Sequence, residues 1–119
     1  WGRLIMVTSI VADLAVPGAA SYIAAKGGLA ALSRALAAEL GATGVTSNAL
    51  SPGFFATETN DQLIASPAGE RQRQRCPAKR WAEPREIAGA AIFLASPAAS
   101  YVNGHTLTVD GGVSATYMS

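Results

Sequence analysis

Two polar side chains, Tyr22 and Lys26, stand in the alanine- and glycine-rich stretch ASYIAAKGG. A spacing of four residues places both on one face of a helix, one turn apart. At a separation of about 4 Å and an effective dielectric constant of about 20, the lysine charge favours a phenolate by about 4 kcal/mol. A phenol in that setting suits general acid–base catalysis. The spacing also recurs by chance on helix surfaces. The surrounding elements therefore decide whether Tyr22 and Lys26 are a catalytic pair or a chance pair.

A hydroxyl and a turn are expected close to this pair. Ser9 follows the apolar run Leu4–Thr8, which is typical of a strand buried on both faces. A second strand, VTSNAL, ends at Ser51-Pro52-Gly53. Parallel α/β sheets bind their ligands at the carboxyl ends of the strands. We therefore expect Ser9 to hydrogen-bond a substrate oxygen while Tyr22 moves the proton.

The helix that carries the pair is predicted over Ala20–Leu40 and is apolar nearly all round. Such a helix needs cover on two sides. Gly27 and Gly28 each cost it about 1 kcal/mol relative to alanine. We expect the close approach of a neighbouring backbone to compensate for them.

The rest of the chain completes an alternating α/β order. Residues 54–82 are expected to be irregular or weakly helical. Pro84 opens a further helical segment, whose buried face has the spacing Ile87, Ala90, Ala91 and Leu94. The stretch HTLTVDGG gives a last short strand. Crossovers of this length predict parallel strands with right-handed connections.

These positions together resemble the C-terminal half of a short-chain dehydrogenase/reductase. The matching residues are Ser9, Tyr22-x-x-x-Lys26, Asn48-Ala49-x-x-Pro52-Gly53-x-x-x-Thr57 and Val109-Asp110-Gly111-Gly112. The resemblance covers essentially the whole chain. It implies the C-terminal half of a Rossmann-type doubly wound α/β fold, with about three parallel strands and flanking helices. It also implies hydride transfer between NAD or NADP and a small-molecule alcohol or ketone.

The resemblance also assigns roles to residues. Ser9 would polarise the substrate oxygen, and Tyr22 would be the acid/base. Lys26 would hold the nicotinamide ribose and favour the phenolate. The turn after the second strand would flank the nicotinamide, which makes Pro52, Gly53, Phe55 and Thr57 cofactor-binding residues, together with Tyr22 and Lys26.

The glycine-rich phosphate loop of that family, Gly-x-x-x-Gly-x-Gly, does not occur in the sequence. We therefore expect residues 1–119 to form a single partial Rossmann-type domain that is inactive alone. A non-catalytic, self-assembling half-domain is the alternative. The residue that selects NAD or NADP lies in the absent half, so the choice stays open.

Two stretches, PGFFATETN and CPAKRWAEP, resemble the gluconate 5-dehydrogenase branch of the family. A 3-oxoacyl-carrier-protein reductase is the close alternative. Six cations crowd the segment that forms the substrate lid by resemblance: Arg71, Arg73, Arg75, Lys79, Arg80 and Arg85. We interpret them as a solvated face, with attraction of an anionic substrate as the second interpretation. Trp81 is expected to pack beneath the lid.

Composition sets the remaining expectations. The chain has 119 residues, a net charge of +1 and 14% charged residues, which gives no reason to expect nucleic acid or a membrane as a partner. The single cysteine, Cys76, cannot form an internal disulfide, so a cytoplasmic setting and an inert thiol are expected. No metal site is expected. Family pairing through the long helix and the last strand implies a homodimer or homotetramer.

Overall fold

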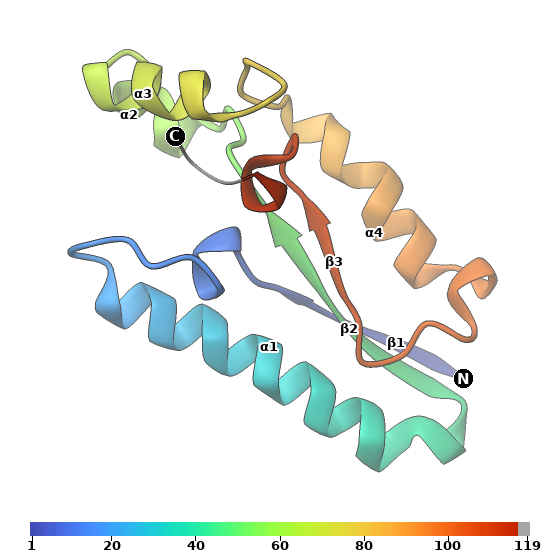
Figure 1. The fold of residues 1–119 in the computed structure, drawn as a ribbon. Coiled ribbons are helices and arrows are strands. Elements are labelled where there is room, and N and C mark those ends of the chain that lie inside the picture. The colour runs from blue at the N-terminus through green and yellow to red at the C-terminus, as the bar shows by residue number, and fades with distance from the viewer. Residues whose placement is uncertain (117–119) are drawn as a thin grey trace.

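Three parallel strands form one sheet in the order β1–β2–β3 (Figure 1). The structure, a computed structural model, describes residues 1–116. The strands are β1 (Gly2–Val7), β2 (Val45–Pro52) and β3 (Thr106–Val109). The register pairs Val7 with Leu50 and Leu50 with Leu107. The predicted α/β class with three parallel strands is confirmed.

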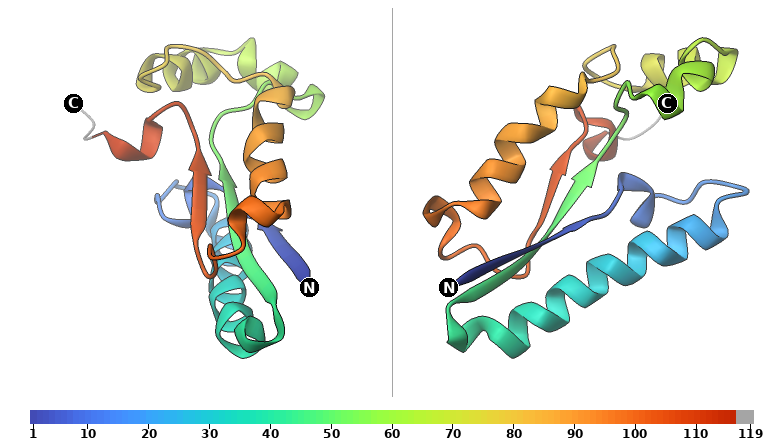
Figure 2. Two further views of the ribbon diagram at one scale, coloured as in Figure 1. Left: turned by 90° about the vertical axis from the view of Figure 1, so that its right-hand side faces the viewer. Right: turned by 180° about the vertical axis from the view of Figure 1, so that it is seen from behind.

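The two crossover helices cover opposite faces of the sheet (Figure 1, Figure 2). They are α1 (Ala20–Leu40) and α4 (Ala88–Ala95). Because the strand order advances in one direction, connections on opposite faces must have opposite hands. The β1–α1–β2 unit is right-handed, as predicted. The β2–α4–β3 unit is left-handed, so that part of the prediction is wrong. The physical reason is burial of the sheet. Because α1 already covers one face, α4 lies on the other face and shields it from water.

The central strand, β2, is buried along most of its length and carries polar residues into the interior. The hydroxyls of Ser47 and of Ser33 on α1 lie 3.4 Å apart. Asn48 donates from Nδ2 to the carbonyl oxygen of Val102 at 2.8 Å and accepts from the backbone N–H of His105 at 3.0 Å. These bonds satisfy a buried amide and fix the loop that leads into β3.

The long helix α1 is only partly covered within this chain. Ser33 and Ala37 are buried, whereas Leu32 is 45% exposed. A Cβ built on Gly27 or Gly28 meets no atom of the described residues within 4 Å. The expected close approach of a neighbouring backbone to these glycines is therefore wrong within the chain.

The segment after β2 is more helical than predicted and lies beyond the carboxyl ends of β2 and β3 (Figure 1). It contains α2 (Asp61–Ile64) and α3 (Pro67–Arg75). Ser66 caps α3, because its Oγ accepts from the N–H of Gly69 at 3.2 Å, and Pro67 fits the first turn. A Cβ on Gly69 would clash with the carbonyl oxygen of Leu63, so the glycine lets α3 lie close to α2.

The predicted apolar face of α4 is confirmed. A short 3-10 turn over Pro84–Ile87 leads into the helix, and Leu94 is fully buried. On the other side, Ile92 is 67% exposed. Among residues 1–116, no helix combines the length and the apolar character needed to cross a membrane.

Candidate active site

A cleft of about 250 Å³ opens at the carboxyl edge of the sheet. Three of its lining residues are Ser9 from the end of β1, Tyr22 from α1 and Gly53 from the end of β2. Residues 54–82, called the lid segment below, contribute Leu63, Gln72 and Trp81. Elements far apart in the sequence therefore meet at the edge where parallel sheets bind ligands. The structure brings two of the three predicted catalytic side chains, Ser9 and Tyr22, into one cleft.

The third, Lys26, lies beside Tyr22 on α1. Its Nζ is 5.7 Å from the centroid of the Tyr22 ring, a distance at which an ammonium is attracted to an aromatic face. The same Nζ donates a hydrogen bond of 3.0 Å to the carbonyl oxygen of Val7, the last residue of β1. Tyr22 is 50% exposed, so its ring is accessible at the mouth of the cleft. The spacing of four residues predicted the pair, and the contact with Val7 had no signal in the sequence.

Ser9 begins a short 3-10 turn that directs the chain away from the sheet. Its backbone is extended, and its Oγ accepts from the N–H of Val11 at 3.4 Å, a long contact. The preceding residue, Thr8, is buried and bonds the carbonyl oxygen of Leu50 through both its backbone N–H (2.8 Å) and its hydroxyl (3.2 Å). The end of β1 is thereby fixed to β2, which positions the Ser9 hydroxyl at the cleft.

The turn after β2 lies against the end of β3. The N–H of Gly53 donates to the carbonyl oxygen of Val109 at 2.9 Å. A Cβ on Gly53 would lie 2.6 Å from Cβ and 2.7 Å from Cα of Asp110. Only glycine permits this approach of two chain segments. Gly53 is the one member of the predicted cofactor turn that lines the cleft.

The other predicted cofactor residues of the turn, Pro52, Phe55 and Thr57, lie outside the residues that line the cleft. Phe55 is buried, and it lines a separate cavity of about 140 Å³ beside Cys76. The N–H of Thr57 donates to the carbonyl oxygen of Phe55 at 3.0 Å. A short parallel bridge between Phe55 and Ala82 ties the turn to the far end of the lid segment. The structure therefore assigns Phe55 to the interior.

An aromatic pair closes the lid side of the cleft. The rings of Phe54 and Trp81 are tilted at 42°, with centroids 5.4 Å apart. Trp81 also donates from its indole nitrogen to the carbonyl oxygen of Gly69 in α3 at 3.4 Å. Trp81 packs beneath the lid as expected, but it is only half-buried and forms part of the cleft wall.

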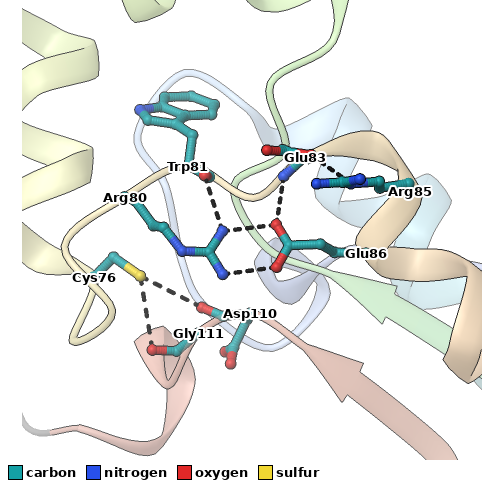
Figure 3. Close-up of polar contacts among 8 residues, drawn as sticks. All are labelled: Cys76, Arg80, Trp81, Glu83, Arg85, Glu86, Asp110 and Gly111. Atoms are coloured by element: carbon teal, nitrogen blue, oxygen red, sulfur yellow. Dashed lines mark hydrogen bonds and ion pairs between the residues drawn. The ribbon is translucent and has the colours of Figure 1, made fainter.

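Several lid cations are paired with carboxylates on the surface. The ion pairs are Arg73–Glu70, Arg80–Glu86 and Arg85–Glu83, each with a shortest contact of 2.6 Å. Figure 3 shows the Arg80–Glu86 pair as two parallel contacts, with the backbone N–H of Glu83 also donating to Glu86. The hydrogen bonds from Arg80 and then from Glu83 lower the pKa of Glu86 to about 2. These contacts support the interpretation of a solvated, internally paired face.

Cys76 and Asp110 link the end of α3 to the chain that follows β3 (Figure 3). Cys76 is 3% exposed, and its Sγ lies 3.7–3.8 Å from the carbonyl oxygens of Gly111 and Asp110. The Asp110 carboxylate accepts from the N–H groups of Gly112 and Ser114. Burial by itself would raise the pKa of Asp110, but the hydrogen bonds from Ser114 and Gly112 outweigh it and hold the pKa below its usual value.

The residues at the cleft fit the nicotinamide end of NAD(P). Lys26 presents an ammonium near the half-exposed ring of Tyr22, a donor set suited to the hydroxyls of a ribose. Gly53 adds backbone without a side chain to the cleft wall at the end of β2. The pyrophosphate and adenosine would need the N-terminus of a helix that follows a glycine-rich loop, and the sequence has no such loop.

Comparisons with known proteins agree with this architecture. A family model described as enoyl-(acyl carrier protein) reductase matches residues 1–114. A gluconate 5-dehydrogenase of Gluconobacter oxydans is 42% identical over 94% of this chain and 44% of its own length. A 3-oxoacyl-[acyl-carrier-protein] reductase of Synechocystis is 43% identical over the same shares.

A solved structure gives the same result. The crystal structure of a gluconate 5-dehydrogenase from Burkholderia cenocepacia, in complex with NADP and tartrate, superposes with a TM-score of 0.90 at 41% identity. The match covers 95% of this chain and 45% of that one. The chain thus spans about half the length of the relatives it matches. With the fold, the Ser9–Tyr22–Lys26 arrangement and these matches in agreement, the chain belongs to the short-chain dehydrogenase/reductase family.

Proposed function

We propose that residues 1–119, joined to a glycine-rich nucleotide-binding half, form an NAD(P)-dependent oxidoreductase that interconverts an alcohol and a ketone. The observation that carries this proposal is the shared cleft of Ser9 and Tyr22, with the Lys26 ammonium beside the Tyr22 ring. A hydroxyl donor, a phenol and a cation at one sheet edge are the groups that carbonyl reduction needs. NADP in the related gluconate 5-dehydrogenase structure supports the cofactor class.

The chain's own residues would bind the substrate oxygen and exchange a proton with it. When bound, the cofactor supplies or accepts the hydride. Ser9 Oγ donates a hydrogen bond to the carbonyl oxygen, which polarises the C=O bond. The Tyr22 hydroxyl donates its proton to that oxygen in reduction and takes it back in oxidation. The positive charge of Lys26, beside the Tyr22 ring, attracts the negative charge that develops on the reacting oxygens.

The decisive variant is Tyr22→Phe in the complete enzyme. It removes one hydroxyl from a half-exposed ring, so the fold should persist while proton transfer is lost. We expect kcat to fall about 10²- to 10⁴-fold. Tyr101→Phe is the matched control, because Tyr101 is 100% exposed and lies outside the cleft. Near-normal turnover of Tyr22→Phe, measured as NAD(P)H absorbance, would remove Tyr22 from the mechanism.

The proposed substrate is a sugar acid of the gluconate type, and a 3-oxoacyl thioester is the alternative. The support is the similarity to a gluconate 5-dehydrogenase in both sequence and structure. The 3-oxoacyl-[acyl-carrier-protein] reductase of Synechocystis matches at nearly the same identity, so the alternative stays open.

A second candidate function is a non-catalytic, self-assembling half-domain. The observation that favours it is the exposed surface of 7204 Å². A compact monomer of 12.1 kDa exposes about 6,000 Å². Oxidation or reduction by the complete enzyme, lost in Tyr22→Phe, would contradict this second candidate.

A further inference from the structure

Gln72 on α3 lines the cleft of Ser9 and Tyr22 and carries an unsatisfied polar atom. Its Oε1 has less than 1 Å² of accessible surface, and no residue in the described range 1–116 donates a hydrogen bond to it. A buried acceptor left in that state is costly, and such groups in native proteins call for an explanation.

The surroundings make this atom distinctive. The cleft wall combines polar side chains with apolar ones, among them Leu63, Phe54 and Trp81. Asn60 also lines the cleft, but its Nδ2 donates to the carbonyl oxygen of Phe55 at 2.9 Å. Among the polar residues of the cleft wall, Gln72 is therefore the one whose side-chain oxygen is buried without a hydrogen bond in the described range 1–116.

Local contacts fix the helix that carries this side chain. The Ser66 cap and the close approach at Gly69 fix α3 against α2, as described above. The other glutamine of α3, Gln74, instead donates from Nε2 to Glu70 Oε1 at 2.7 Å on the exposed side. One glutamine of α3 thus bonds on the surface, and the other lines the cleft.

We infer that Gln72 is a specificity-determining residue whose carboxamide turns into the cleft when substrate binds, so that its oxygen accepts a hydrogen bond from a hydroxyl group of the substrate. This inference rests on the proposed oxidoreductase function and names the substrate class. A polyhydroxylated acid carries hydroxyl donors on the carbons beside the reacting one. An unsubstituted 3-oxoacyl chain carries none there, so it would leave Oε1 buried and unpaired. Gln72 therefore favours the sugar acid over the acyl thioester.

The test uses the complete enzyme and two substrates, 5-keto-D-gluconate and the N-acetylcysteamine thioester of 3-oxobutanoate. In Gln72→Leu, which keeps similar bulk and removes the acceptor, kcat/KM for 5-keto-D-gluconate should fall about 5- to 150-fold. The value for the thioester should stay the same or rise. Gln74→Leu is the matched control, and it should change neither value.

A binding measurement separates recognition from chemistry. Calorimetric titration with D-gluconate should show a weaker Kd in Gln72→Leu by a similar factor, with Gln74→Leu unchanged. Equal losses for both substrates, or an unchanged Kd, would overturn the role of Gln72. An unmodified enzyme that turns over neither substrate with NAD(H) or NADP(H), yet binds D-gluconate through Gln72, would contradict the proposed function and not the binding site.

Discussion

Individual residues at the carboxyl edge divide into those proposed to do chemistry and those that fix the chain segments around them. Lys26 belongs to both groups, since its Nζ lies near the Tyr22 ring and donates to the carbonyl oxygen of Val7. Gly53 belongs to the second group, because its missing side chain lets β2 end against Asp110. The proposed site therefore depends on a glycine whose missing side chain would point at Asp110.

Gly53→Ala tests whether the turn after β2 tolerates one added carbon atom at this position. The added Cβ would lie 2.6–2.7 Å from Cβ and Cα of Asp110, a distance that real Cβ atoms do not tolerate. We expect the free energy of unfolding to fall by about 1–3 kcal/mol. Urea unfolding followed by circular dichroism measures the change.

The matched control is Gly89→Ala on α4, where the added Cβ meets no described atom. Alanine is the better helix former, so this variant should gain about 1 kcal/mol within the single chain. A Gly53→Ala protein as stable as the unmodified one would show that the turn at Asp110 can relax.

At the scale of elements, the Arg80–Glu86 ion pair connects the lid segment to the turn before α4 (Figure 3). Glu86 closes a capping box at the turn before α4, and Arg80 holds the same carboxylate from the lid segment. The pair thus joins the end of the lid segment to the start of the helix that covers the second face of the sheet.

This pair predicts a stability that depends on acid pH. The pKa of Glu86 is lowered from 4.5 to about 2 by Arg80, so the folded state favours the carboxylate. Its contribution is fully present above about pH 4.5 and is lost as the pH falls through about 2. Glu70, also at about 2 through Arg73, contributes to the same window.

In Arg80→Met, the decline of Tm between pH 5 and pH 2 should be shallower than in the unmodified protein. Differential scanning calorimetry over that range measures the slope. Arg71→Met is the control on the same lid segment, and it should leave the slope unchanged. An identical slope in Arg80→Met would show that the pair contributes nothing to folding.

The whole molecule is more extended and more exposed than a compact domain of its size. The radius of gyration is 15.3 Å, against about 13.5 Å for a globular chain of this length. Large apolar side chains contribute to the exposed surface, among them Leu32 on α1 and Ile92 on α4. Leaving apolar surface in contact with water costs a free energy of about 25 cal/mol per Å².

We therefore expect residues 1–119 to form a homodimer or homotetramer, with α1 and the last strand as the contact surfaces. Sedimentation velocity at micromolar concentration should show the larger species. Leu32→Glu should weaken it, because a charge would be buried at the contact, whereas Leu14→Glu in the loop before α1 should not. A stable monomer with cooperative unfolding would contradict this expectation.

Local sequence signals predicted much of the fold. The β-branched runs gave β1 and β2 to within two residues at each end, and the apolar spacing gave the buried face of α4. The sequence failed at α3, where PAGERQRQR has no apolar face. Its signal was the cap, Ser66 followed by Pro67, which is a local feature that hydrophobic periodicity does not detect.

The sequence by itself determined the spacing of Tyr22 and Lys26, the strand and helix order, and the Pro52-Gly53 turn. These follow from backbone geometry over a few residues. Only the tertiary structure decided which face α4 covers, that Lys26 contacts Val7, that Phe55 turns into the interior, and that Gln72 joins the cleft. Each of these depends on which distant segments meet. Periodicity fixes which side of an element is apolar, but not the neighbour against which that side is buried.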